Sequence, residues 1–404
     1  MPAAIILPAN AASAMSHALG RQQLVIICGT GVTASATGGV KTSSWKGLIE
    51  DGIRRAEAEG LRNADWVARA MGDVDSNILT DMIVAAEKVT AALQEQPGLF
   101  EKWLEESVGS LKCKDPALPN ELARLARDGA LLVTTNYDDI LADAGALKIV
   151  TESDGGAELR KAAKRLSAAI VHLHGHWKFP NSVVFGTSSY TRIASSESAK
   201  AFMTTLLYAE TIVFVGVGEG LCDPNFEGLR KWCAAILGNT GDPHYRLARE
   251  GELAAIAAQH EAGENIKVVS YGADYKDLQP FLASVSPSVP TRSAGVAGGQ
   301  ALQSRAAPTP TPLSFATRAK ETEDRVRLRA HIEALAPVLT SLNAASSDDQ
   351  ERFSDAAVFE DVLRQPLEEI TRADPSELAG TDLSSAVAFA QRLRNLVSLV
   401  DIGT

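Results

Sequence analysis

The chain has 404 residues, of which 45% are hydrophobic and 22% charged, and its formal net charge is −11. This length predicts about two or three domains, each able to bury an ordinary core. The acidic balance argues against direct nucleic-acid binding, because a protein that holds the phosphate backbone needs a basic face.

No apolar run approaches the ~20 residues of a membrane span. The N-terminal stretch is interrupted by Pro8 and lacks the basic region of a signal peptide. We therefore expect a cytoplasmic protein that does not bind membranes. The four cysteines lie far apart without a C-x-x-C pair, which excludes a cysteine-rich zinc ribbon. Cys28 ends an apolar run and is expected to be a buried small hydrophobe.

The first third of the chain predicts one strand followed by helices. A short helix over residues 10–22 leads into a strand over Gln23–Cys28. A glycine turn follows this strand, and we expect no helix to begin there. Residues 49–112 contain nothing strand-like and predict an insertion of several helices that covers a pocket. One helical face there has apolar residues at three- and four-residue steps: Ile78, Met82, Ala85, Val89 and Leu93.

Strands and helices alternate after this insertion. Asn120 is expected to cap a helix that Gly129 ends. Asp223-Pro224 predicts a further helix start. The alternation predicts an α/β fold within residues 1–285, with a Rossmann-like, mostly parallel sheet and helices on both faces. The expected strands lie near residues 130–135, 147–151, 170–174, 183–185, 212–215 and 266–270.

The composition changes near the end of this predicted domain. Residues 286–314 are rich in Pro, Ala and Ser and predict a linker, and residues 315–404 predict a C-terminal helical region. So few helices bury little by themselves. We expect them to pack on the main domain or on another chain, which favours a homo-oligomer assembled through helical regions. The first of them has a heptad-like apolar seam: Leu328, Ile332, Leu335, Leu339 and Leu342.

Two of the strand tips are glycine turns. The turn Gly29-Thr30-Gly31-Val32-Thr33 lets the backbone approach a phosphate, and its hydroxyls can bond to one. An ordinary structural turn explains this motif about as well, and Ala34 stands where the dinucleotide-binding fingerprint has its third glycine. Gly216-Val217-Gly218 forms a second turn. Two such turns at separate tips suit a ligand with two phosphates, since ligands of open α/β sheets bind outside the carboxyl ends of the strands.

The tip of the strand near residues 130–135 carries amide and carboxylate groups. Asn136 can donate and accept at once, which suits a ribose hydroxyl or an attacking water. Asp138 can serve the same site or simply cap the following helix. For Asn136 the capping explanation is weaker, because this residue lies deeper at the strand end.

Three histidines follow the strand near residues 170–174. His172, His174 and His176 are two residues apart, a spacing that places side chains on one face of a strand. One interpretation is a metal site built from two or three of them. The other makes His174 a general base at the pocket and places His172 in the core. No carboxylate or cysteine partner for a metal is evident, so no metal is expected.

In this order, the motifs resemble the sirtuin fold, specifically the sirtuin-like domains of bacterial anti-phage defence proteins. The resemblance runs from about Leu24 to Val285. The chain lacks the four-cysteine zinc module of protein-deacylating sirtuins and has an additional helical insertion. Both differences favour the branch of the family that consumes NAD. The matching pieces are Gly29-x-Gly31-Val32-Thr33 with Ser44-Trp45, Thr135-Asn136-x-Asp138, Leu173-His174-Gly175, Val184-Phe185-Gly186 with Ser189-Tyr190, Gly218 with Asp223-Pro224-Asn225, and His244-Tyr245 with Tyr271 and Asp274-Tyr275.

The resemblance implies that NAD⁺ is a substrate, hydrolysed to nicotinamide and ADP-ribose so that NAD is depleted in anti-phage defence. It makes His174 the general base, with Asn136 positioning the water or ribose and Asp138 orienting that group. It further implies control by oligomerisation and a HerA-like motor ATPase partner. The residues that it assigns to the cofactor are Gly29, Thr30, Gly31, Thr33, Gly216, Gly218, Asp223, Asn225 and Tyr271.

Three alternatives stay open. The first is a sirtuin-type protein deacylase or ADP-ribosyltransferase, which the missing zinc module disfavours. The second is a module that senses NAD or ADP-ribose without turnover, although such a sensor needs neither Asn136 nor His174. The third is a metallohydrolase built on the three histidines.

Overall fold

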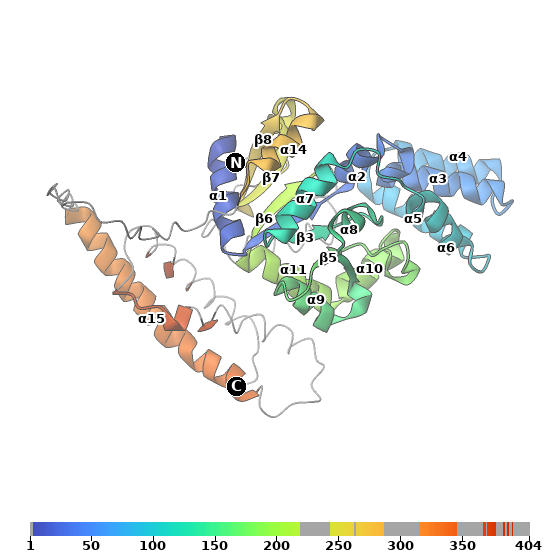
Figure 1. The fold of residues 1–404 in the computed structure, drawn as a ribbon. Helices are drawn as coiled ribbons and strands as arrows, with labels where there is room; N and C mark the ends of the chain where they lie inside the picture. Colours follow the sequence, from blue (N-terminus) through green and yellow to red (C-terminus); the bar gives the residue numbers. More distant parts are fainter. Residues whose placement is uncertain are drawn as a thin grey trace. The chain divides into compact units, whose positions relative to one another are not determined.

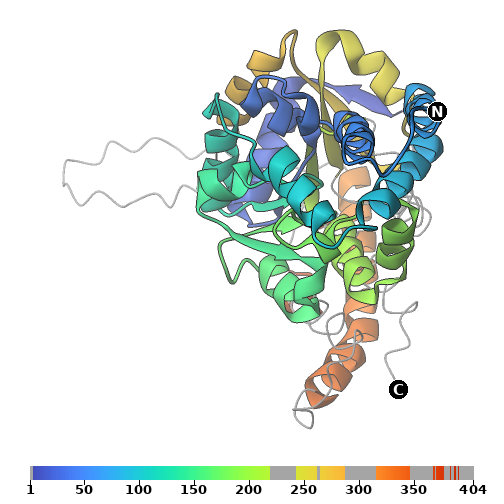
Figure 2. The same ribbon diagram turned by 90° about the vertical axis from the view of Figure 1, so that its right-hand side faces the viewer.

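The computed structural model describes residues 3–218, 243–261, 264–286 and 315–345, and short stretches within 367–390. These residues fall into two compact units, one up to residue 286 and one from residue 315 onward. None of the described helices has the length and apolarity that a membrane crossing requires. Figures 1 and 2 show the ribbon in two views.

Within the described residues, eight strands form one all-parallel sheet in the order β1-β8-β7-β6-β2-β3-β5-β4. The predicted α/β fold is therefore confirmed. From the central strand β2 the chain builds outward on both sides, so β2 and its neighbours form the point at which the strand order reverses. The strands are β1 (Ala4–Ile6), β2 (Leu24–Cys28), β3 (Leu131–Thr134), β4 (Lys148–Thr151), β5 (Ala169–His172), β6 (Thr211–Val215), β7 (His244–Arg249) and β8 (Ile266–Gly272).

Helices cover both faces of the sheet, because each central strand is apolar on both faces. In β2, Leu24 and Ile26 pack with α1 (Pro8–Gly20), α7 (Ala117–Arg127) and α14 (Leu278–Ala283). Val25 and Ile27 point to the other face, against α9 (Gly156–Ala163) and α11 (Glu197–Ala209). Cys28 belongs to the first of these cores and is fully buried, as predicted. Outside the helical insertion, the other α-helices described in this unit are α2 (Thr30–Thr37), α8 (Ile140–Gly145), α10 (Thr187–Ser195) and α13 (Leu253–Ala257).

The helical insertion has its own apolar core and lies together at one end of the sheet in Figure 1. It consists of α3 (Trp45–Ala58), α4 (Ala64–Asp75), α5 (Leu79–Leu93) and α6 (Leu99–Leu104), followed by the short π-helix η2 (Glu105–Gly109). Ser44 caps α3, since its Oγ accepts a hydrogen bond from the backbone N of Gly47 at 3.1 Å. Trp103 is the largest fully buried side chain of this core.

Several local predictions are wrong. A helix does begin at the first glycine turn, because Gly29 is extended and α2 starts at Thr30. Helix α7 begins at Ala117, so Asn120 lies inside it and is not its cap. Residues 183–185 form no strand, because their backbone hydrogen bonds go to isolated partners and not to a neighbouring strand. Val184 N, for example, donates to His174 O. Strands β1 and β7 were not predicted.

The second unit is described over α15 (Phe315–Ala345) and the short stretches that follow. On α15, Leu328 and Leu335 of the predicted seam are buried, while Ile332 and Leu339 are partly buried. The Leu342 side chain and residues 287–314 lie outside the described residues, so the predicted linker is not described.

Candidate active site

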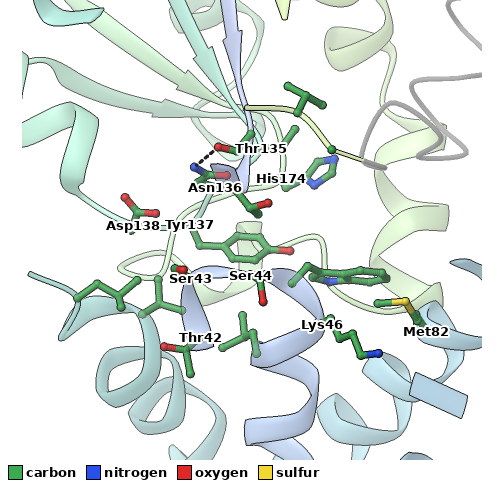
Figure 3. Close-up of a pocket in the computed structure, with 18 of the residues that line it drawn as sticks. Thr42, Ser43, Ser44, Lys46, Met82, Thr135, Asn136, Tyr137, Asp138 and His174 are labelled. Carbon is green, nitrogen blue, oxygen red and sulfur yellow. Dashed lines mark hydrogen bonds between the residues drawn. The ribbon is translucent and has the colours of Figure 1, made fainter. Parts of the chain in front are cut away.

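A cavity of about 250 Å³ opens at the carboxyl ends of β2, β3, β5 and β6, next to the helical insertion. Figure 3 shows Asn136, Tyr137 and His174 on one side of it, and Ser44 and Met82 on the other. The strand tips contribute the polar side chains of Thr30, Thr135, Asn136, Asp138 and His174, with Gly29, Val217 and Gly218 beside them. The insertion and the segment before it contribute Thr42, Ser43, Ser44, Trp45, Lys46, Leu48, Leu79, Met82, Val108 and Leu111.

Asn136 is the centre of a buried hydrogen-bond network. Its side-chain Nδ2 donates to Gly29 O at 3.0 Å and to Thr33 Oγ1 at 2.8 Å. Thr33 Oγ1 in turn donates to Asp138 Oδ2 at 2.6 Å. Asn136 Oδ1 is buried and has no hydrogen-bond partner among the described residues. Because both amide hydrogens are used, the orientation of the amide is fixed, and Asn136 is one of the residues that line the cavity.

Asp138 is the third residue of this network, after Asn136 and Thr33. Its Oδ1 accepts a bond from the backbone N of Ile140 at 3.0 Å, so Asp138 also holds the start of α8. Burial raises the pKa of Asp138 and outweighs the hydrogen bonds from Thr33 and Ile140, which lower it. Oδ1 of Asp138 thus bonds the start of α8, while Oδ2 bonds Thr33, so the side chain joins the helix start to the Asn136 network.

The three histidines do not share a face, contrary to the spacing argument. Strand β5 ends at His172, and Gly175, with a φ of +79°, turns the chain. His172 and His176 are buried with their rings packed edge to face, 4.8 Å apart. His174 instead lines the cavity, 6.0 Å from the Tyr190 ring. The described residues contain no group of three side chains suited to hold a metal ion.

His172 lies behind Asn136. Its Nδ1 donates to the backbone O of Asn136 at 2.8 Å. Burial lowers the pKa of His172 to about 3, with a smaller contribution from His176, so the ring is neutral at pH 7. His176 is also buried, with its Nε2 3.3 Å from Asp139 Oδ1, and burial lowers its pKa to about 4.

The two glycine turns pack on each other. Gly29 N donates to Val215 O and Gly31 N to Gly216 O, both at 2.9 Å. A Cβ on Gly31 would lie 2.9 Å from Gly216 Cα, and Gly216 itself has a φ of +61°. These glycines therefore bring the tips of β2 and β6 together. Gly31 N is already bonded to Gly216 O and is not available to a ligand. Thr30, the first residue of α2, lines the cavity, and the positive end of the helix dipole there favours an anion.

Four of the predicted cofactor residues in the described part of the chain do not line this cavity: Gly31, Thr33, Gly216 and Tyr271. Thr33 stands behind Asn136 and Asp138 and does not line the cavity. Tyr271 is on β8, three strands from β2, and its ring packs against the core with α1 and α14. Gly31 packs on Gly216. Asp223 and Asn225 lie outside the described residues.

Residues 130–269 match the family model of the SIR2-like domain. The match begins just before β3 and ends in β8, and it contains Asn136, Asp138 and His174. A SIR2-like domain implies an NAD-dependent activity, because domains of this kind use NAD. Gly29, Thr30 and the helical insertion precede the matched residues, yet they form the other walls of the same cavity.

Sequence reasoning missed the apolar half of this cavity. Leu48, Leu79, Val108 and Leu111 come from the insertion and give no chemical signal of their own. Trp45 and Tyr190 entered only through the resemblance. Trp45 Nε1 is buried and has no hydrogen-bond partner among the described residues. Two lining residues, Asn136 and Trp45, therefore each have a buried polar atom without a partner among the described residues, an acceptor and a donor respectively.

Proposed function

We propose that this protein is an NAD⁺ hydrolase that cleaves the bond between nicotinamide and ribose and releases nicotinamide and ADP-ribose. The observation that carries the proposal is the fixed Asn136 amide, which lines the same cavity as His174 at the reversal point of a parallel sheet and whose Oδ1 has no hydrogen-bond partner among the described residues. The SIR2-like match supports NAD as the substrate.

The chemistry needs little from the protein. Nicotinamide is cationic on the ribose and leaves as a neutral amine, so the enzyme must position the reactants and stabilise an oxocarbenium-like carbon. Asn136 Oδ1 accepts a hydrogen bond from a ribose hydroxyl or from the attacking water. His174 is the general base for that group, a role worth about 10²–10⁴-fold in rate. Asp138 acts on Asn136 through Thr33.

The pyrophosphate is assigned to the two strand tips beside this amide. Thr30 opens α2, and Gly218 follows β6, where an added Cβ would meet no described atom within 4 Å. Both line the cavity. A helix N-terminus and an exposed backbone are suited to phosphate oxygens. Residues 219–242 follow directly and lie outside the described residues, so Asp223 and Asn225 stay proposed cofactor residues.

A second candidate function is that of a sirtuin-type transferase, which transfers the ADP-ribosyl group of NAD⁺ to an acyl-lysine or to another group on a protein. The apolar wall of Trp45, Leu48, Leu79 and Met82 favours it, because an acyl chain would be buried there. The predicted depletion of NAD in anti-phage defence, assembly into a homo-oligomer and the HerA-like motor ATPase partner are further proposals, and they rest on the resemblance alone.

Product identification by mass after incubation of the full chain with NAD⁺ tests the proposal. We expect nicotinamide and free ADP-ribose in equal amounts. Acyl-ADP-ribose formed only with an acylated peptide would support the transferase instead. Unchanged NAD⁺ that nevertheless raises the unfolding temperature would support a sensor. Either result would overturn hydrolysis.

A further inference from the structure

A second cavity of about 600 Å³ shares Thr42 and Leu111 with the proposed NAD site. We call it the outer cavity. Its lining comes from the segment before α3, from α3, from Trp103 of α6, and from η2 with the residues after it. Its size is within the range of sites for small molecules.

The outer cavity is positively charged, although the chain as a whole carries −11. Both acidic side chains in its lining are already bonded. Asp51 Oδ2 accepts from Trp103 Nε1 at 2.8 Å and from Ser107 Oγ at 2.7 Å. Glu106 pairs with Arg55 at 2.6 Å.

Three further cations line the outer cavity: Arg54, Lys112 and Lys114. All three are exposed, and none has a carboxylate within ion-pair distance among the described residues. Lys114 is anchored at its backbone, since its N donates to Ala36 O at 2.7 Å. The lining therefore has four cations, Arg54, Arg55, Lys112 and Lys114, against two carboxylates, and this excess of positive charge suits a polyanion.

The wall between the two cavities is a linked piece of structure. Thr42 Oγ1 donates to Ser107 O at 2.8 Å, and Ser107 lies in the π-helix η2. From the same turn Val108 lines the NAD site, whereas Ser107 lines the outer cavity. Short π-helices occur often at functional sites. A ligand in the outer cavity thus contacts the residues that shape the NAD site.

We propose that the outer cavity binds a phosphorylated small molecule and that its occupancy changes the affinity of the NAD site through the wall formed by Thr42 and η2. Arg54, Lys112 and Lys114 supply the charge-assisted bonds to phosphate. The binding site stands independently of the reaction, whereas its influence on NAD rests on the proposed function.

Calorimetric titration of the full chain with inorganic pyrophosphate tests the site. Arg54→Ala should weaken binding about tenfold or more, the loss expected for one charge-assisted bond. Arg127→Ala is the matched control, because Arg127 is exposed, has no ion pair among the described residues and lies outside the cavity. It should leave the affinity within about twofold. Equal effects of both variants, or no pyrophosphate binding, would overturn the proposal, as would binding of single-stranded DNA through these residues without pyrophosphate binding.

Titrations with ADP-ribose and with ATP, each in wild type and Arg54→Ala, distinguish the reaction product from another nucleotide as the source of the phosphate. The coupling is read as NAD⁺ affinity with and without saturating pyrophosphate. We expect a change of about fivefold or more that disappears in Arg54→Ala. An unchanged affinity contradicts the coupling. If NAD⁺ does not bind at all, the proposed function fails while the pyrophosphate titration still decides the site.

Discussion

Thr33 holds together the residues that the proposed reaction needs. Its hydroxyl accepts from Asn136 Nδ2 and donates to Asp138 Oδ2, so one oxygen orients an amide and satisfies a buried carboxyl. The sequence motif predicts Thr33 as a phosphate contact. Its hydroxyl instead acts one layer behind the cavity, because α2 begins at Thr30 and its first turn carries Thr33 inward.

Replacing Thr33 with Val removes that hydroxyl at nearly constant shape. The variant should lose roughly tenfold or more in kcat for nicotinamide release, because the Asn136 amide is no longer fixed. Its free energy of unfolding should fall by about 1–3 kcal/mol, since a buried carboxyl loses its partner. The control is Thr37→Val, which removes an equally buried hydroxyl one turn later on α2. Equal kcat values in the two variants would contradict this role of Thr33.

The buried histidines predict how stability depends on pH. The pKa values of His172 and His176, about 3 and about 4, lie below the unfolded value of about 6.5. The unfolded chain therefore binds more protons as the pH falls from about 6.5 towards 4, and each histidine lowers the free energy of unfolding by about 1.4 kcal/mol per pH unit.

His172→Asn keeps a donor for the Asn136 carbonyl but removes the titrating ring. Denaturant unfolding at several pH values should show a shallower loss of stability below pH 6.5 than wild type. His17→Asn, an exposed histidine at the end of α1, serves as the comparison and should keep the wild-type slope. A wild-type slope in His172→Asn would show that this ring does not stay neutral.

At the scale of elements, sequence predicted the strands that are apolar on both faces. Strands β2, β3 and β6 have this character, because helices cover both sides of the sheet. Strand β7 was missed since it contains His244 and Arg246, which are buried through partners on other elements that no local pattern reveals. Val183–Phe185 was predicted as a strand from its apolar residues alone, yet Val184 bonds individually to His174 and Tyr137.

The contact between the tips of β2 and β6 gives a prediction at this scale. In Gly216→Ala the new Cβ would lie 2.8 Å from the backbone N of Val32, at a φ of +61°. The free energy of unfolding should fall by about 2 kcal/mol or more. Gly251→Ala, where no atom lies within 4 Å, should change stability far less. Thermal unfolding of both variants measures this, and equal midpoints would mean that the tips can separate without cost.

At the scale of the first unit as a whole, the insertion and the sheet layer share one site. The Trp103 and Phe185 rings pack with centroids 5.6 Å apart, and Glu87 Oε2 accepts from Ser188 N and Oγ at 3.1 and 3.0 Å. The sequence indicated that the insertion covers a pocket. It could not indicate which residues line it, because apolar pocket residues and apolar core residues follow the same helical period.

Glu87 joins α5 to α10, and α10 carries Tyr190 of the cavity wall. Glu87→Ala should raise the KM for NAD⁺ severalfold while kcat changes little, because a wall of the binding site is loosened and the amide network is intact. Glu57→Ala, an exposed carboxylate on α3 without an ion pair among the described residues, is the control. Steady-state kinetics give both constants, and unchanged KM in Glu87→Ala would contradict this coupling.

The initial rate of nicotinamide release from NAD⁺ by the purified full chain tests the central claim most directly. Wild type should release nicotinamide, and Asn136→Ala and His174→Ala should each lower the rate about 10²-fold or more. His17→Ala, at an exposed residue that does not line the cavity, should match wild type. Release that persists in both cavity variants, or that falls equally in His17→Ala, would contradict the assignment of the reaction to this site.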